Sequence, residues 1–390
     1  MFALMMLATA AIAIPTGFRE TVEKYWHFDE LSKTPDCRPC PHEECAFPGM
    51  DALLLKGKGP KNTTAEFFAY YARPQGNVPP GGFPAVLLTH GGGGTAFPIA
   101  IDRWRKAGFV VMATDWYNQM PAPGLTNAAT SESSLPRVDL PGGKRNDIWA
   151  NIANLVLAHS YLRSRSEVNQ KKTVFVGLSW GSWYGSTLTA LDPRFRGVVN
   201  IYCGDVKTAK DTSLYLVNGR FLHAAKCPTW WVVGTNDGNV SPATSQTGFE
   251  ECARCYGHAM IPRLPHSHIG FEFGSVMRMA KHFTSGEPSL PILGPTKICG
   301  CTASAKILKH GKSVGRAVLH YTRDRDTRKT SERKWIESSA KVADDVVSAE
   351  IPSDAFQAYL SLYEKDEGRF HDLCGSSDVL EFRGKHEEGP

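Results

Sequence analysis

Residues 173–181 read TVFVGLSWG, an apolar run that leads into a serine flanked by two glycines. The run is typical of a buried strand, and the residues after Gly181 are compatible with a helix. Glycines suit a turn so sharp that a Cβ at Gly177 or Gly181 would collide with the neighbouring strand or helix. The stretch therefore predicts a strand, a tight turn and a helix, with the Ser179 hydroxyl exposed above the carboxyl edge of a sheet.

The same alternation of strand and helix continues on both sides of this stretch. Continuous apolar runs, which indicate strands buried on both faces, alternate with longer segments compatible with helices. Strands are predicted at 65–74, 84–88, 109–114, 173–177, 197–202, 229–234 and 259–264, and helices at 99–106, 145–164, 182–191, 242–256 and 270–283. The first strand alternates and should be antiparallel. The pattern predicts an α/β domain over residues 65–288, with a mostly parallel sheet covered by helices.

The composition changes at residues 286–295, where GEPSLPILGP is typical of a Pro-rich linker. Beyond the linker, short runs separated by polar turns indicate strands. These runs span residues 317–322, 333–340, 346–352, 358–364 and 378–382. We therefore expect a small all-β, sandwich-like domain over residues 289–384 and a frayed tail at 385–390. Residues 15–64 form a separate cysteine-containing segment before the α/β domain.

The charge of the chain does not favour a nucleic-acid partner. A net charge of +5 is mild for 390 residues, and Lys and Arg are scattered rather than gathered into a stripe. Residues 323–333 form the clearest basic run, but acidic residues interrupt it, so it predicts a solvated turn. Apolar residues make up 42% of the chain and charged residues 21%, the composition of an ordinary globular protein.

The first residues are typical of a targeting segment. Residues 1–14 are apolar, and Ala11-Ile12-Ala13 offers small residues at which a signal peptidase cuts, although no Lys or Arg precedes the run. The stretch is too short to span a bilayer, and no other apolar run reaches that length. We therefore expect a signal peptide and a secreted or extracytoplasmic protein without a membrane span, with a buried N-terminal segment as the alternative.

The chain has ten cysteines, most of them close in sequence to another. The clusters are Cys37, Cys40 and Cys45, then Cys252 and Cys255, then Cys299 and Cys301. Together with a secretory route, this number favours disulfides. A zinc site formed by the first cluster and His42 is the alternative, but these ligands are spaced too closely for the usual pair of knuckles. We predict at least one disulfide and no metal.

A serine hydroxyl needs a base within hydrogen-bond reach and a group that orients the base. Asp237 directly follows a predicted strand, where a loop can present a carboxylate to Ser179, and Asp205 is the reserve candidate. Two histidines, His266 and His268, follow the last predicted strand. We favour His266 as the base because it comes first after the strand. We expect His268 to line the pocket or to orient its neighbour.

The segment HGGGG (90–94) follows another predicted strand and suits an oxyanion-binding loop. Glycines let backbone N–H groups approach the negative charge that develops on a carbonyl oxygen during acyl transfer. The predicted donors are the N–H groups of Gly91, Gly92, Gly93 and Trp180. A phosphate cradle is the alternative, but the Lys-Ser/Thr ending of such loops is missing.

The expected substrate pocket is aromatic. We predict that it is lined by His90, Trp116, Trp183 and His268. Aromatic faces of this kind suit stacking on a sugar ring or covering an acyl group, although core packing is the alternative role for at least one tryptophan.

These motifs together resemble the acetylxylan-esterase and dienelactone-hydrolase-like branch of the α/β-hydrolases. The likeness runs through residues 83–97, 146–168, 176–186, 234–242 and 265–273. It implies the α/β-hydrolase fold, with Ser179 as nucleophile, Asp237 as acid and a histidine of the PHSH loop as base. Ser182 departs from the pattern, since relatives often carry a second glycine there.

The resemblance implies a serine esterase that needs no cofactor and acts on a small-molecule or carbohydrate ester. An acetylated carbohydrate is the first substrate expected. Two alternatives stay open: a serine peptidase of the same fold, and a non-catalytic binding protein on a hydrolase scaffold.

Overall fold

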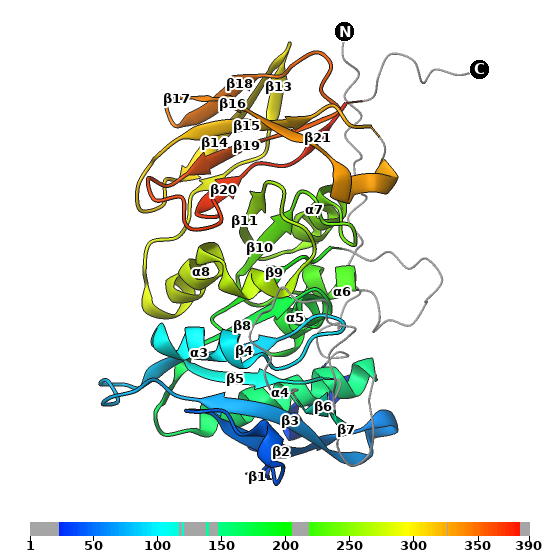
Figure 1. The fold of residues 1–390 in the computed structure, drawn as a ribbon, viewed down its shortest axis with the longest axis vertical. Coiled ribbons are helices and arrows are strands. Elements are labelled where there is room, and N and C mark those ends of the chain that lie inside the picture. The colour runs from blue at the N-terminus through cyan, green and yellow to red at the C-terminus, as the bar shows by residue number, and fades with distance from the viewer. Residues whose placement is uncertain are drawn as a thin grey trace, which may run out of the picture.

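The computed structural model describes residues 23–116, 119–120, 138–139, 147–204, 218–325 and 327–382. Its main sheet has nine strands in the order β1-β2-β3-β5-β4-β8-β9-β10-β11 (Figure 1). The strands are β1 (Cys37–Pro39), β2 (Asp51–Lys58), β3 (Thr64–Ala72), β4 (Phe83–Thr89), β5 (Val110–Thr114), β8 (Val168–Leu178), β9 (Gly197–Ile201), β10 (Thr229–Gly234) and β11 (Cys255–Ile261). The strands from β5 to β11 run parallel, whereas β1, β2 and β3 pair antiparallel. The predicted, mostly parallel sheet is confirmed.

Helices cover both faces of this sheet (Figure 1). They are α2 (Phe28–Leu31), α3 (Pro98–Lys106), α4 (Ile148–Ser164), α5 (Trp180–Leu191), α6 (Asn218–His223), α7 (Pro242–Glu251) and α8 (Gly274–Ser285). Successive residues of β8 pack into hydrophobic cores on opposite faces of the sheet. Val174 and Val176 face α3 and α8, whereas Phe175 faces α4 and α5. Because side chains alternate between the faces of a strand, burial on both sides explains the continuous apolar runs.

Several element boundaries differ from the prediction, among them those around β11. The helix predicted over 242–256 ends at Glu251, and β11 begins at Cys255 rather than at residue 259. The same strand ends at Ile261, before Leu264, because Pro262 has no N–H to donate and Arg263 turns the chain with a φ of 61°.

The C-terminal strands form two antiparallel sheets. One has the order β12-β14-β18-β17 with β13 beside β14, and the other has the order β16-β15-β19-β20 with β21 beside β19. The strands are β12 (Ile292–Leu293), β13 (Lys297–Cys299), β14 (Thr302–Lys309), β15 (Ala317–Thr322), β16 (Trp335–Ser339), β17 (Lys341–Ala343), β18 (Val346–Glu350), β19 (Gln357–Tyr363), β20 (Cys374–Ser376) and β21 (Leu380–Glu381). Ala305 and Val347 from one sheet share a buried core with Leu319 and Leu360 from the other. The all-β C-terminal unit is therefore confirmed, and we call it the C-terminal sandwich.

This sandwich is attached to the edge of the main sheet that β11 forms (Figure 1). The Met260 N–H of β11 donates to Ser376 Oγ at 2.9 Å. Asp372 is fully buried, and its Oδ2 accepts the Ser275 N–H at 2.7 Å, in the first turn of α8. Leu290, in the predicted linker, has no exposed surface. The segment between the two units is therefore packed rather than a free linker.

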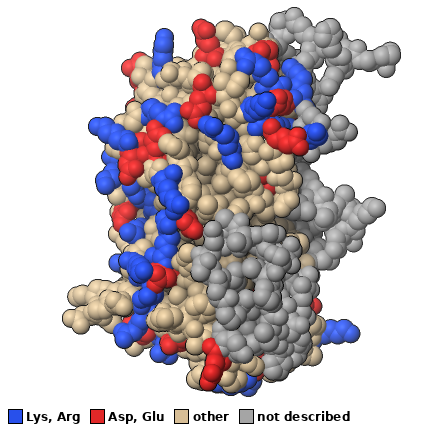
Figure 2. Space-filling view, in the orientation of Figure 1, with Lys and Arg blue, Asp and Glu red and all other residues tan. Residues whose placement is uncertain are grey.

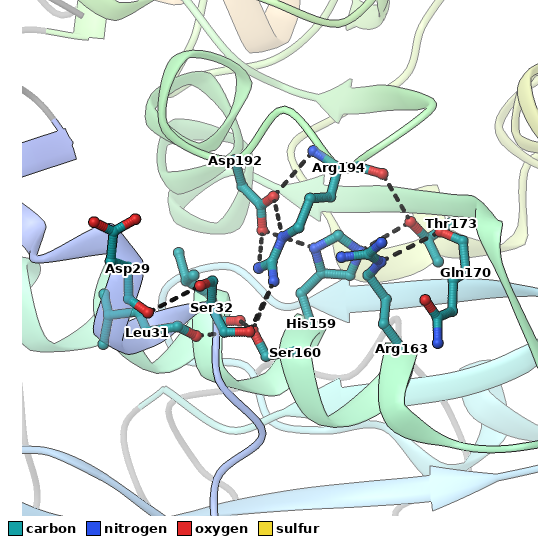
Figure 3. Close-up of polar contacts among 11 residues, drawn as sticks. Asp29, Leu31, Ser32, His159, Ser160, Arg163, Gln170, Thr173, Asp192 and Arg194 are labelled. Carbon is teal, nitrogen blue, oxygen red and sulfur yellow. Dashed lines mark hydrogen bonds and ion pairs between the residues drawn. The ribbon is translucent and has the colours of Figure 1, made fainter. Parts of the chain in front are cut away.

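A buried polar network joins α4, the end of α5 and β8 (Figure 3). The Nδ1 of His159 lies 2.7 Å from Asp192 Oδ2, and its Nε2 lies 2.8 Å from Thr173 Oγ1. Arg194 donates to both carboxylate oxygens of Asp192 and, at 2.9 Å, to Ser160 Oγ. Because each charged group has a partner, this network is stable in a site that excludes water.

On the face shown in Figure 2, Lys and Arg lie interspersed with Asp and Glu. Elsewhere in the described chain, oppositely charged side chains form ion pairs, such as the exposed pair of Arg38 with Glu66. No helix within the described residues is long and apolar enough to cross a membrane.

All ten cysteines lie in the described part of the chain, and no disulfide joins any two of them there. The predicted disulfide therefore has no support. Within the described ranges, no three His, Cys, Asp or Glu residues are grouped so that they could hold a metal ion. The predicted signal peptide at 1–14, the reserve acid Asp205 and the tail at 385–390 lie outside the described residues.

Candidate active site

Ser179 lies at the sharp turn between β8 and α5. Its φ of 54° and ψ of −117° are rare for a residue with a side chain. A Cβ added to Gly177 would lie 2.4 Å from the Gly181 carbonyl oxygen, and one added to Gly181 would lie 2.2 Å from that of Thr89. Both glycines are therefore required by the close approach of the backbone, as the sequence predicts.

Ser182, where relatives often have glycine, anchors this turn. Its Oγ lies 2.6 Å from the Ile201 carbonyl oxygen and accepts the Ile201 N–H at 2.8 Å. The Ser179 N–H also donates to the Ile201 carbonyl, at 2.8 Å. The hydroxyl group therefore fixes the start of α5 against the end of β9.

His266 bridges the serine and the carboxylate. Its Nε2 lies 2.8 Å from Ser179 Oγ, and its Nδ1 lies 2.7 Å from Asp237 Oδ2. The imidazole is 20% exposed, whereas the carboxylate is fully buried. Beneath the imidazole, the ring of Tyr202 packs at 5.0 Å between centroids. The structure thus brings together the three residues that the sequence predicts for the triad.

The loop after β10 presents Asp237 in a fixed orientation. Its Oδ1 accepts the N–H groups of Asn239 at 2.7 Å and Val240 at 2.8 Å, which leaves Oδ2 for His266. The Asp237 carbonyl oxygen accepts the Thr330 hydroxyl at 2.9 Å. Thr330 lies in the 3-10 helix η5 (Thr327–Glu332), within the run that the sequence predicts to be a solvated turn.

That prediction for residues 323–333 is wrong at its C-terminal end. Arg333 is only 4% exposed, and its Nη1 donates to Gln357 Oε1 at 2.8 Å. The Asn236 side chain donates to the carbonyl oxygens of Ser331 and Arg333, at 3.0 and 2.8 Å. The carbonyl oxygens of this segment thus accept hydrogen bonds from the loop that carries Asp237. The pattern of charged residues in the sequence gives no signal of these contacts.

The HGGGG loop approaches the serine from β4. A Cβ on Gly91 would lie 2.9 Å from the Cβ of Ser179, so the backbone comes as close to the nucleophile as the sequence predicts. The Gly91 N–H, however, donates to His268 Nε2 at 2.9 Å. This contact argues against Gly91 as an oxyanion donor. Gly92 lies in the same cavity as Ser179 and Trp180.

His90 supports this loop from below. Its Nδ1 lies 2.7 Å from the Gly91 carbonyl oxygen, its Nε2 lies 3.2 Å from Asp115 Oδ1, and only 2% of the residue is exposed. Trp116 stacks on the His90 ring and donates its Nε1 to the His90 carbonyl oxygen at 2.9 Å. Neither residue reaches the cavity surface, so their prediction as pocket residues is wrong. Both have buried polar partners that fix the loop instead.

His268 begins the 3-10 helix η4 (His268–Glu272) and lies at the base of the cavity. It is 3% exposed and packs against Phe97. Burial, with a smaller contribution from His90, lowers the pKa of His268 to about 3, so the ring is neutral at physiological pH. A neutral Nε2 accepts the Gly91 N–H, which a protonated ring would be unable to do.

The cavity above Ser179 has a volume of about 850 Å³, which is within the range of ligand sites. It is lined by Gly92, Ser179, Trp180, Asn239, Ile261, Pro262, Arg263, Leu264, Pro265, His266, Ser267, His268, Ile269 and Phe370. Trp180 is 45% exposed, and Trp183 packs on its edge without lining the cavity.

The sequence prediction does not include nine of these residues, among them Asn239, Arg263 and Phe370. Asn239 and Arg263 follow the carboxyl ends of β10 and β11, where parallel sheets of this class bind their ligands, so the strand pattern alone offered a signal. Phe370 comes from the C-terminal sandwich, and no local pattern marks it.

Of the comparisons with known proteins, only the one with solved structures found similar proteins. No protein-family model and no curated protein matches the sequence. The structure is similar to an acetyl xylan esterase from a Paenibacillus species at a TM-score of 0.50 and 15% identity, over 68% of this chain and 98% of that one. It is also similar to acetyl xylan esterase 1 from a Thermoanaerobacterium species (TM-score 0.43, 17% identity, 63% and 88% covered). A glucuronoyl esterase from Solibacter usitatus is a third similar structure (TM-score 0.46, 10% identity, 69% and 92% covered). The α/β-hydrolase fold expected from the sequence motifs is therefore confirmed.

Proposed function

We propose that this chain is a serine esterase in which Ser179 is the nucleophile, His266 the general base and Asp237 the acid that orients the base. One observation carries the proposal: a single imidazole contacts the Ser179 hydroxyl at 2.8 Å and the buried Asp237 carboxylate at 2.7 Å. The elbow holds this serine in a strained conformation that exposes its hydroxyl to the cavity. Such an arrangement meets the geometric requirement for an activated serine.

The proposed reaction has two steps. Ser179 Oγ attacks the ester carbonyl carbon while His266 Nε2 takes the hydroxyl proton, and the Asp237 carboxylate stabilises the resulting imidazolium. When the tetrahedral intermediate collapses, the bond to the alcohol oxygen breaks and His266 returns the proton to the leaving alcohol. Water then attacks the acyl-enzyme, with His266 again as the base, and releases the carboxylic acid and the free serine.

The negative charge of the tetrahedral intermediate requires N–H donors close to Ser179. We assign this role to the N–H groups of Gly92 and Trp180, because Gly92 lies across the cavity from the elbow and Trp180 is the first residue of α5. A helix N-terminus also favours negative charge at this position. Gly91 is left out because its N–H is bonded to His268.

An acetylated carbohydrate is the first substrate to test. Trp180 offers an exposed aromatic face beside the nucleophile, on which a sugar ring can stack. The cavity is also much larger than an acetyl group, so part of the alcohol moiety enters with the ester. Because an acetyl xylan esterase has a similar fold, acetylated xylan is the first polysaccharide to test as a substrate.

The test compares the wild type with Ser179→Ala on short-chain nitrophenyl esters, acetylated xylan and aminoacyl nitroanilides. We expect ester turnover by the wild type and a loss of at least about 10³-fold in the variant, since nucleophile and base act as a unit. Full activity of a folded Ser179→Ala protein contradicts the proposal. Preferential cleavage of nitroanilides would instead favour a peptidase, and turnover of none of the substrates would favour a binding protein.

A further inference from the structure

Arg263 lies on the wall of the proposed catalytic cavity. It lies two residues after β11 and three before His266, and it is exposed to solvent. Its backbone N–H donates to Thr235 Oγ1 at 2.8 Å, which fixes the turn. Arg263 lines the same cavity as Ser179 and His266. It is therefore positioned to contact whatever the nucleophile acts on.

The charge of Arg263 is not balanced on this wall. Among the described residues that line the cavity there is no Asp or Glu, and Arg263 is the only side chain among them that is permanently charged. The other polar groups of the described lining are hydroxyl, amide and imidazole groups, contributed by Ser179, Ser267, Asn239 and the two histidines. A single cation among the lining residues of a concave site attracts anionic ligands.

The backbone of Arg263 is strained. Its φ of 61° lies in the left-handed region, where glycine is accommodated without a steric cost. A non-glycine residue in this conformation is held there by its surroundings, here by the Thr235 hydroxyl and by Pro262 before it. Strained backbone conformations of this kind are concentrated at functional sites, where a side chain is held in a defined direction. The strain is thus a second observation, independent of the charge, that points to a role for the side chain.

We propose that Arg263 binds a carboxylate on the substrate, so that the enzyme prefers esters of carboxylate-bearing molecules, such as acetylated sugar acids, over neutral esters of the same shape. This inference rests on the proposed function. The planar guanidinium group forms paired hydrogen bonds with a carboxylate, which fixes the orientation of the ligand as well as its charge. A volume of about 850 Å³ holds a ring that bears both the ester and the carboxylate.

The test measures kinetics on matched pairs of esters that differ in one negative charge. For a carboxylate on the alcohol part, the pair is 4-acetoxybenzoate and its methyl ester. For a carboxylate on the acyl part, the pair is monomethyl and dimethyl succinate. The variants are Arg263→Gln, which removes the charge, and Arg263→Lys, which keeps it without the planar fork. Arg254→Gln is the control, because this exposed residue precedes the other end of β11, about 20 Å away, and changes the net charge equally.

We expect Arg263→Gln to raise KM about tenfold for the carboxylate ester of at least one pair and less than about twofold for the neutral ester, with kcat little changed. Arg263→Lys should give an intermediate KM, and Arg254→Gln should behave as the wild type. Added salt should raise the wild-type KM for the anionic ester alone. If both pairs are turned over and Arg263→Gln leaves both preferences unchanged, the carboxylate role is wrong while the esterase proposal stands. If the wild type turns over none of the four esters and neither the nitrophenyl esters nor acetylated xylan, the esterase proposal and this inference both fail.

Discussion

At the scale of single residues, the two histidines of the PHSH loop have different surroundings. His266 reaches both Ser179 and Asp237, whereas His268 is buried and accepts a hydrogen bond from the Gly91 N–H. We predict that His266→Ala lowers kcat about as much as Ser179→Ala, by at least about 10³-fold, because the base and the nucleophile act together. His268→Ala should cost about tenfold, since it removes only a support of the loop beside the nucleophile.

Two further variants separate the hydrogen bond of His268 from its packing. His268→Gln keeps an acceptor for the Gly91 N–H and should retain more of kcat than His268→Phe, which fills the space without one. The measurement is kcat and KM on a nitrophenyl ester at pH 7.5, together with the unfolding transition of each variant. An inactive His268→Ala beside an active His266→Ala would reverse the assignment of the base.

At the scale of elements, η5 of the C-terminal sandwich holds the loop that carries the acid. The Thr330 hydroxyl donates to the Asp237 carbonyl oxygen at 2.9 Å, and the Asn236 side chain donates to Ser331 and Arg333. We predict that Thr330→Val, which is nearly isosteric, lowers kcat about threefold to tenfold with KM unchanged, because Asp237 loses part of its support. Kinetics on a nitrophenyl ester measure this effect.

The control for this prediction is Thr330→Ser, which keeps the hydroxyl group and should restore kcat. Thr330 lies on the surface of the sandwich that faces the acid loop, so both variants should fold. A Thr330→Val protein that is folded and has the kcat of the wild type would show that the loop holds Asp237 without help from η5.

The sequence predicted the elements whose signals are local. The elbow, the HGGGG loop and the order of serine, acid and histidine each follow a strand with a clear apolar pattern, so Ser179, Asp237 and His266 are found without any structure. The strand before the histidines was placed too late, because its first residues, CYGH, are polar or small and lie near the edge of the sheet.

The contacts that cross between units had no local signal. Residues 327–333 have the charge pattern of a solvated turn, yet their carbonyl oxygens accept from Asn236, about 95 residues earlier in the chain. Likewise, His90 and Trp116 are aromatic residues beside the active site, but they lie under the loop rather than on the pocket wall. His90 contacts Asp115 and the Gly91 carbonyl oxygen, and Trp116 donates to the His90 carbonyl oxygen. Pattern analysis identifies which residues follow a strand, and not which way each side chain turns.

At the scale of the whole molecule, four of the five buried histidines in the described part of the chain have a lowered pKa, and they are distributed over both units. His159 lies in α4, His258 in β11, His268 in η4 and His320 in β15, and each is at most 7% exposed. Burial lowers the pKa of all four, to about 4 for His159 and about 3 for His268 and His320. Some of these rings also have hydrogen-bond partners, for example His320, whose Nε2 lies 3.1 Å from the Tyr363 hydroxyl oxygen. The fold as a whole is therefore built to keep these rings uncharged.

These histidines predict that the protein loses stability as the pH falls below about 6.5. An unfolded histidine takes up a proton near pH 6.5, whereas the buried ring does not do so until the pH is much lower. The unfolded state therefore binds more protons in this window, and each histidine lowers the free energy of unfolding by up to about 1.4 kcal/mol per pH unit below 6.5. Carboxylates whose pKa is depressed, such as Asp102 and Glu167, add to the loss only at lower pH.

Urea denaturation followed by tryptophan fluorescence at pH 7.5, 7.0, 6.5, 6.0 and 5.5 measures this effect. We expect little change in the free energy of unfolding between pH 7.5 and 7.0 and a steep fall below pH 6.5. His320→Gln should reduce the slope in the acidic window by about a quarter, because one of four rings no longer titrates on unfolding. The matched control is His310→Gln, since the His310 side chain is 50% exposed. A free energy of unfolding that stays constant from pH 7.5 to 5.5 would mean that the buried rings are protonated in the folded protein, and the account of the His268 and Gly91 contact would then be wrong as well.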